Sequence, residues 1–138
     1  MSGSLTLTLL DGVTAQRIAH VASLVAADGS GSFGLLPGHA PLLTVLEPGL
    51  LRYRAGAGDW TWLACAGGML RCTHEAGGTA VTIVSRRFLR GTAPEALQAQ
   101  LEALLASESE IRLGTRQQRE QVQLALQRRL QELAEQRQ

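Results

Sequence analysis

The residue types that could do chemistry are few in this sequence, and the most suggestive group is a glycine motif. Residues 29–34, GSGSFG, match the spacing of glycine loops that bind dinucleotides, and they follow a predicted strand. That motif works only where a helix begins, because the helix N-terminus must face the pyrophosphate. Pro37, Gly38 and Pro41 come next and prevent a lasting helix. The motif therefore predicts a glycine-rich turn and no dinucleotide site.

The other reactive side chains form no recognisable catalytic or metal-binding pattern. His20, His39 and His74 are far apart, and no Cys/His spacing matches a zinc site. Cys65 and Cys72 both lie in apolar, strand-like sequence, which is typical of buried free thiols in a reducing compartment. The absence of lysine excludes a P-loop lysine and a Schiff-base lysine. We expect no catalytic residue, no metal and no cofactor.

Length and composition predict one ordinary domain, or a small domain with an appendage. The chain has 138 residues, 45% of them hydrophobic, and a formal net charge of +1. That charge gives no reason to expect binding to nucleic acid or to an anionic membrane. No leader opens the sequence, and no apolar run approaches the roughly 20 residues of a membrane span. We expect a soluble cytoplasmic protein that meets a membrane only through a partner.

The rest of the chain is organised around residues 31–50, GSFGLLPGHAPLLTVLEPGL. Pro37-Gly38 and Glu47-Pro48-Gly49 predict two turns, and the apolar segment 42–46 between them predicts a buried strand. The segment 30–36 is predicted to be a loop with an apolar tip. Its apolar residues either contact a partner or fold back onto the core. His39 is either a contact residue or a loop histidine bound to a nearby carbonyl.

The hydrophobic pattern divides the chain into a β part and a helical part. Residues 1–90 contain short strands with frequent turn signals, and Leu5–Leu9 alternates leucine with threonine. After Gly91, Pro94 starts a helical pattern that Gly114 interrupts, with a possible new helix start at Thr115. The sequence therefore predicts an α+β protein: an N-terminal antiparallel β-sandwich in residues 1–90, followed by a C-terminal two-helix antiparallel hairpin in residues 91–138.

The run 35–54, LLPGHAPLLTVLEPGLLRYR, strongly resembles the epsilon subunit of F-type rotary ATP synthases. In that family a Gly-x-(Leu/Ile)-Pro-Gly-His-Ala-Pro-Leu-Leu-Thr segment occupies the same place in a chain of similar length. The likeness continues through Gly67-Gly68-Met69-Leu70 to the terminal helices. The altered loop and a missing ATP motif favour the alternate, second-copy type of complex that some bacteria carry.

The resemblance implies a non-catalytic central-stalk subunit that couples ion-driven rotation of the c-ring to ATP synthesis or hydrolysis. The β-sandwich would bind the gamma subunit through His39 and Thr44, and the c-ring through the loop containing Ser32, Phe33 and Leu35. Family members often have a glutamate at the position of Ser32, so charge pairing with the ring is not expected here. The complex would lie on the cytoplasmic face of the bacterial plasma membrane, with H⁺ or Na⁺ as the coupled ion.

The resemblance also implies a regulatory role for the helical segment. Arg128 and Arg129 match basic residues that contact the catalytic beta subunit and block ATP hydrolysis. Some members bind ATP through an acidic-x-x-Arg-Ala segment, but Gln118, Gln121 and Val122 stand at the matching positions here. Because neither the acidic residue nor the arginine of that segment is present, we do not expect this chain to bind ATP. The alternative function is a stand-alone ATP-binding regulatory module, in which the hairpin closes over the nucleotide.

Overall fold

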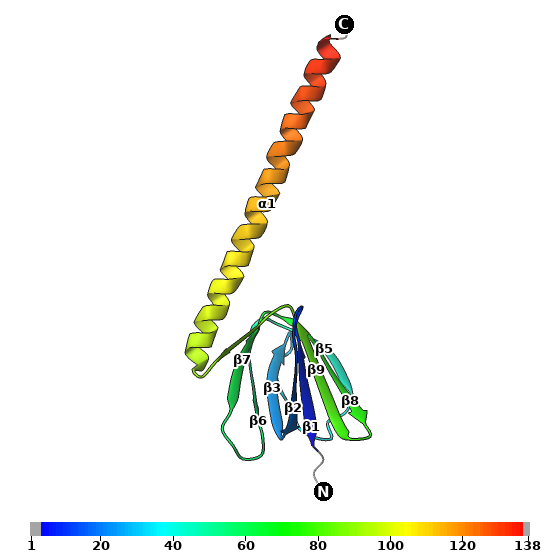
Figure 1. Cartoon of the computed structure of the whole chain (residues 1–138), viewed down its shortest axis with the longest axis vertical. Helices are drawn as coiled ribbons and strands as arrows, with labels where there is room; N and C mark the ends of the chain where they lie inside the picture. The colour runs from blue at the N-terminus through cyan, green and yellow to red at the C-terminus, as the bar shows by residue number, and fades with distance from the viewer. Residues whose placement is uncertain (1–3, 137–138) are drawn as a thin grey trace. The chain divides into compact units, whose positions relative to one another are not determined.

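A computed structural model describes residues 4–136, apart from the side chains of residues 112, 115 and 136. Ten strands precede one long helix, α1 (Pro94–Gln136). The α+β class is therefore confirmed, with the β part first (Figure 1). The strands are β1 (Leu5–Leu10), β2 (Ala15–Val21), β3 (Ser23–Asp28), β4 (Gly31–Leu35), β5 (Leu42–Leu46), β6 (Gly49–Arg54), β7 (Thr61–Cys65), β8 (Gly68–Glu75), β9 (Gly78–Ser85) and β10 (Phe88–Gly91).

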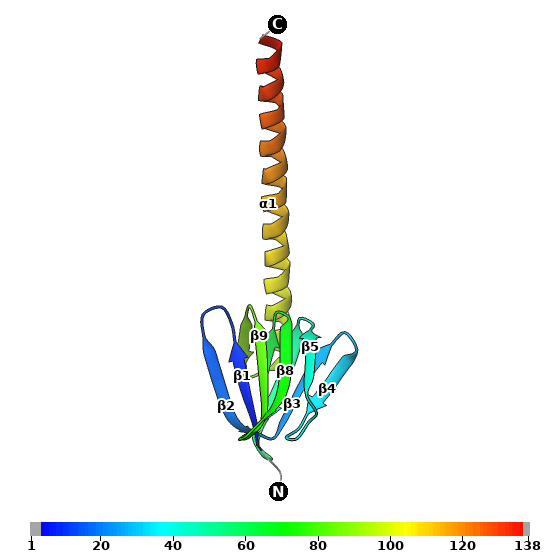
Figure 2. The same cartoon turned by 90° about the vertical axis from the view of Figure 1, so that its right-hand side faces the viewer.

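The strands form one sheet in the order β10-β7-β6-β3-β5-β8-β9-β1-β2, and β4 pairs with β3. All neighbours are antiparallel except β1 and β9, which are parallel. Strands β2, β1, β9, β8 and β5 lie side by side (Figure 2). The sheet curls so that β6 and β7 lie away from β8 and β9 (Figure 1). Its inner side holds the core.

The period of two in the sequence determines which side chains enter this core. In β1, Leu5, Leu7 and Leu9 are buried while Thr6 and Thr8 are partly exposed, as the alternation predicts. Leu63 of β7 and Leu70 of β8 are also completely buried and belong to the same cluster. The core therefore gathers leucines from strands that are distant in sequence, which holds the curled sheet together through apolar burial.

The turn predicted at Pro37-Gly38 is present. The amide of His39 donates to the carbonyl of Leu36, 3.1 Å away. Gly38 has a φ of 88°, which glycine adopts without a steric penalty. The Gly38 amide donates to Oγ1 of Thr79, 2.7 Å away, which fixes the turn against β9. The turn therefore sets where β5 enters the sheet.

The expected loop over residues 30–36 is mostly a strand. β4 pairs with β3 in a regular antiparallel register, from Leu24 opposite Leu35 to Asp28 opposite Gly31. Phe33 and Leu35 are two residues apart, so in a strand their apolar side chains point to the same side, and both pack on the core. Their burial favours an extended, paired backbone over a free loop.

The C-terminal segment differs from the expected two-helix hairpin, because α1 is continuous through Gly114. A glycine in a helix interior costs only about 1 kcal/mol relative to alanine. No proline follows Pro94, and most of the surrounding residues are good helix formers such as Ala, Leu, Glu, Gln and Arg. Continuing the helix keeps every backbone hydrogen bond that a turn at Gly114 would break.

Two compact units share α1, with the division after Glu102. The first unit contains the sheet and the opening turns of α1, whose Leu97 and Leu101 are buried. A Cβ added to Gly91 would lie 3.1 Å from a Leu97 methyl carbon, so this helix start packs closely on β10. The second unit begins at Ala103 and contains the remainder of α1, up to Gln136. Within residues 4–136, no helix is both long and apolar enough to span a membrane.

Candidate protein-binding face

Strand β5 does not have the environment predicted for it. Its apolar run was expected to be buried, and Leu46 is, but Leu43 and Val45 are each 64% exposed. Neighbouring residues of a strand point to opposite sides of a sheet. Leu42, Thr44 and Leu46 therefore face inward, while Leu43 and Val45 face outward. The prediction of a fully buried strand is wrong for this outer side.

The outward residues of β5 continue across the neighbouring strands as one apolar surface. Val45 pairs with Met69 of β8, and Met69 pairs with Val84 of β9. Met69 and Val84 are 47% and 50% exposed. Residues paired directly across strands point to the same side of the sheet. We call Leu43, Val45, Met69 and Val84 the apolar face.

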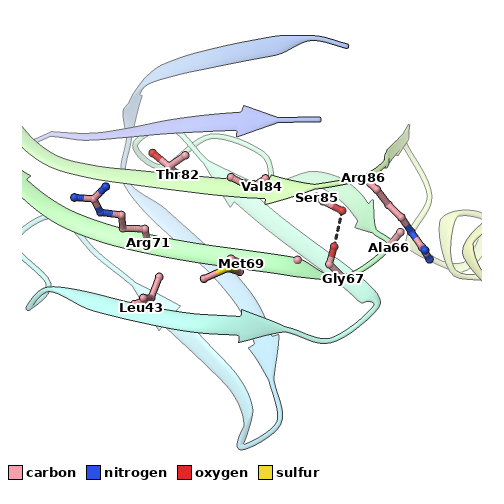
Figure 3. A pocket seen from close by; sticks show the side chains of 10 residues that line it. Leu43, Ala66, Gly67, Met69, Arg71, Thr82, Val84, Ser85 and Arg86 are labelled. Atoms are coloured by element: carbon pink, nitrogen blue, oxygen red, sulfur yellow. Dashed lines mark hydrogen bonds between the residues drawn. The ribbon is translucent and has the colours of Figure 1, made fainter. Parts of the chain in front are cut away.

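A cavity of about 710 Å³ opens on the apolar face (Figure 3). Its floor includes Gly68, where an added Cβ would lie only 1.9 Å from the Val84 carbonyl oxygen. Beside it, the Ser85 hydroxyl donates to the Gly67 carbonyl at 2.7 Å and fixes the strand ends. The ten lining residues are Leu43, Ala66, Gly67, Gly68, Met69, Arg71, Thr82, Val84, Ser85 and Arg86. A shallow apolar hollow on a rigid sheet is suited to receiving a side chain of another protein.

The two residues expected to contact gamma, His39 and Thr44, have intramolecular partners. His39 is partly exposed, and its Nδ1 lies 2.7 Å from the carbonyl oxygen of Ala40, which requires the proton on Nδ1. Thr44 is on the inner side of β5, and its hydroxyl donates to Asp28 at 2.7 Å. Thr44 therefore lies on the opposite side of β5 from Leu43 and Val45.

Asp28 is the acceptor at the centre of a small polar cluster between β3 and β5. Its carboxylate accepts hydrogen bonds from the Ser30 hydroxyl, the Thr44 hydroxyl and the Ser30 amide. These bonds favour the charged form and hold the pKa of Asp28 below its usual range, with the Ser30 hydroxyl as the largest cause. The cluster ties the β3–β4 turn to β5.

The three residues expected to contact the c-ring are in different environments. Ser32 is exposed on β4, Phe33 is half-buried against the core, and Leu35 is completely buried. Leu35 therefore presents no exposed side chain to a partner in this structure. Leu36, the next residue, is 59% exposed. Of the two alternatives for the apolar residues of this segment, packing on the core holds for Phe33 and Leu35.

On α1, Arg128 and Arg129 are exposed, as are Gln118, Gln121 and Val122 at the positions of the missing ATP motif. The part of α1 after Glu102 also exposes several large apolar side chains. They are Ile111, Leu113, Val122, Leu124, Leu126, Leu130 and Leu133, all more than half exposed. This apolar content was predicted to be covered by a second helix, which the continuous α1 does not provide.

The cysteines are free thiols in the core, as predicted. Burial raises the pKa of the Cys72 thiol, which disfavours a reactive thiolate. Within residues 4–136, no three His, Cys, Asp or Glu side chains gather in a way that could hold a metal.

Sequence reasoning missed an arginine–tryptophan cluster on β6 and β7. The Arg52 guanidinium lies 4.6 Å from the ring centroid of Trp60 and 5.3 Å from that of Trp62. Arg54 lies 4.5 Å from the same Trp60 ring. The alternation of Arg52 and Arg54 in β6 could have indicated the stacking.

The sheet of this chain matches one known protein family. The model of the β-sandwich domain of the ATP synthase delta/epsilon chain matches residues 6–91. This chain belongs to the ATP synthase delta/epsilon family. The match covers the sheet of the structure and ends just before α1.

Two curated relatives agree with the predicted epsilon type within this family. The chain is 48% identical over 82 residues to "ATP synthase epsilon chain 2" of Cereibacter sphaeroides, which covers 59% of this chain and 54% of the relative. It is 45% identical over 94 residues to the protein of the same name from Paraburkholderia xenovorans, which covers 68% and 63%. The matches thus span less than two thirds of either relative. The number in both names agrees with the predicted alternate type.

Two solved structures share the fold of this family member. One is the central stalk and c-ring of the Tetrahymena thermophila mitochondrial ATP synthase. It matches with a TM-score of 0.52 at 16% identity, covering 62% of this chain and 66% of that one. The other is the Euglena gracilis mitochondrial ATP synthase, a structure of OSCP, F1 and c-ring in rotational state 1. It has a TM-score of 0.58 at 23% identity and covers 77% and 66%.

Proposed function

We propose that this chain is the non-catalytic epsilon subunit of an F-type ATP synthase and couples c-ring rotation to ATP synthesis or hydrolysis. The observation that carries the proposal is the apolar face, four large side chains exposed together on a rigid sheet. Exposed apolar surface of this kind is typical of a protein interface. Family membership supports the gamma subunit as its partner.

The contact residues follow from this arrangement. Leu43, Val45, Met69 and Val84 contact gamma directly. His39 contacts gamma from the neighbouring turn, while Thr44 positions β5 through its hydrogen bond to Asp28. Ser32 is the c-ring contact, because it is exposed on β4, with Phe33 supporting the strand from its half-buried position. The protein reaches the cytoplasmic face of the bacterial plasma membrane only as part of this complex.

Co-purification of the full chain with gamma tests the proposal. Val45→Glu places a charge on the apolar face. Gamma would have to bury that charge without a partner, which costs free energy, so the affinity for gamma should fall at least tenfold. Val13→Glu is the matched control, because Val13 is 93% exposed and lies outside the face, in the turn after β1. If the unmodified chain never associates with gamma, the proposed function is wrong.

We infer a separate regulatory role for residues 91–138, in which Arg128 and Arg129 contact the catalytic beta subunit and slow ATP hydrolysis. Their exposure on α1 leaves both guanidinium groups accessible to carboxylates of a partner. The test is ATP hydrolysis by the complex containing Arg128→Glu/Arg129→Glu. Hydrolysis should rise severalfold, whereas Arg116→Glu/Arg119→Glu, with the same charge change elsewhere on α1, should have little effect. Equal rates for all three complexes would contradict the role.

A further inference from the structure

The apolar face is bordered by a line of polar side chains that crosses the same side of the sheet. Arg71 of β8 pairs with Leu43 on one side and with Thr82 on the other. Thr82 pairs with Thr8 of β1, and Thr8 pairs with Arg17 of β2. Because directly paired residues share a side, both arginines face the same way as the apolar face.

Arg71 is the charged residue of this line that adjoins the apolar face. Its side chain lines the cavity together with Leu43, Met69 and Val84 (Figure 3). It is exposed, and within residues 4–136 it makes no ion pair. No acidic residue lines the cavity. The lining of the cavity is therefore mainly apolar, and its border carries a positive charge.

Covering the apolar face would remove water from Arg71. A guanidinium that loses its hydration without gaining a partner costs several kcal/mol, so a tight interface must supply an acceptor. A carboxylate is the acceptor that matches the planar guanidinium, since it can take two parallel N–H···O bonds. The geometry of the cavity adds a second requirement, because an apolar hollow at the centre of an interface is best filled by a large apolar side chain.

We propose that Arg71 pairs with a carboxylate of the partner, which also inserts a large apolar side chain into the cavity beside it. This inference rests on the proposed function, and the partner is the gamma subunit. Gamma would then present an aspartate or glutamate next to a large apolar residue. Arg71 thereby determines the orientation in which gamma docks, because the carboxylate and the apolar side chain fit in only one direction along β8.

Arg17 provides an internal control for this proposal. It is also exposed on the same side, but three inter-strand spacings away, about 14 Å from Arg71. It lines a separate polar hollow that also contains Glu75. The charge of Arg17 therefore has an acidic neighbour within the chain, and it does not adjoin the apolar face.

The test is the affinity of the full chain for purified gamma, measured at low and at moderate salt. Arg71→Gln should weaken binding about 10- to 100-fold and reduce its salt dependence, because a paired interface charge is lost. Arg71→Lys should recover part of the affinity, since it keeps the charge but not the paired geometry. Arg17→Gln should stay within about twofold of the unmodified chain. Circular dichroism should show that all variants are folded, because both side chains are exposed.

The outcomes separate this inference from the function on which it rests. If Arg71→Gln binds gamma as tightly as the unmodified chain, with the same salt dependence, the carboxylate pairing is wrong while the gamma interface stands. If the unmodified chain does not bind gamma, the proposed function fails as well. Sedimentation of the chain alone provides a further check. If the chain alone forms dimers and Arg71→Gln abolishes them, a second copy of the chain occupies the apolar face, and the proposal is overturned.

Discussion

At the scale of single residues, burial separates neighbours that the sequence does not distinguish. Leu35 and Leu36 are adjacent and identical, yet Leu35 is completely buried and Leu36 is 59% exposed. Leu35→Ala should lower the free energy of unfolding by about 2–5 kcal/mol, because it removes core contacts and leaves a cavity. Leu36→Ala should change it by no more than about 0.5 kcal/mol. Urea unfolding measures both, and equal effects would mean that β4 is not folded onto the core.

The hydrogen bonds to Asp28 should make the free energy of unfolding depend on pH in the acid range. These hydrogen bonds hold the folded-state pKa of Asp28 below its ordinary value of 3.8, so the carboxylate stabilises the fold at a pH above that value. This contribution is lost as the pH falls through the lower folded-state pKa. Unfolding followed between pH 5 and pH 2 should therefore show a smaller acid-dependent loss for Asp28→Asn than for the unmodified chain.

Thr44→Val is the graded comparison for this prediction. It removes one of the hydrogen bonds to Asp28 and leaves those from Ser30 in place. Its acid dependence should fall between those of the unmodified chain and Asp28→Asn. If all three chains lose stability in parallel as the pH falls, other carboxylates control the acid response.

At the scale of elements, β8 and β9 leave no room for a side chain at Gly68. A Cβ at Gly68 would overlap the Val84 carbonyl, so Gly68→Ala must displace a strand. We expect a loss of about 1–3 kcal/mol in unfolding free energy, as for other overpacked sites. Gly77→Ala is the control, since nothing lies within 4 Å of its added Cβ. Thermal unfolding of the two variants should differ clearly, and similar midpoints would contradict this packing.

The continuity of α1 can be measured directly. Spin labels at positions 106 and 131 should be about 38 Å apart along one helix, at 1.5 Å per residue. In a hairpin with its turn near Gly114, the two labels would be only about 20 Å apart. Replacing Cys65 and Cys72 by alanine confines labelling to the chosen sites. A short distance would restore the hairpin that the sequence pattern predicts.

The sequence predicts elements well where one physical signal dominates. Strict alternation in Leu5–Leu9 and proline before glycine at Pro37-Gly38 each led to the observed structure. It predicts poorly where a signal has two physical meanings. The apolar run of β5 is consistent with burial on both sides or with one side open to a partner. Gly114 is consistent with a turn or with a tolerated helical glycine.

The candidate site was predictable only in part for the same reason. The motif around Pro37-Gly38 pointed to the region next to the apolar face, and the family resemblance pointed to β5. The apolar face itself depends on the pairing of β5 with β8 and of β8 with β9, which brings Val45, Met69 and Val84 together from distant segments. Cross-strand register of this kind follows from the whole sheet and cannot be read from any one segment.

At the scale of the whole molecule, the sheet and the part of α1 after Glu102 differ in ways that suit different tasks. The sheet has a continuous core and a fixed apolar face, which suit the transmission of torque. Residues 103–136 form a helix with exposed apolar and basic side chains, which suit reversible contact with a partner. The first turns of α1 belong with the sheet, so a chain that isolates the sheet should end at Glu102 and keep Leu97 and Leu101.

The central claim is that the sheet couples rotation through its apolar face, and ATP-driven ion pumping tests it most directly. A complex assembled without this chain should hydrolyse ATP with little pumping, and adding the full chain should restore pumping. Val45→Glu should fail to restore it, while Val13→Glu should succeed. Pumping that is equally strong without the chain, or with Val45→Glu, would contradict the account.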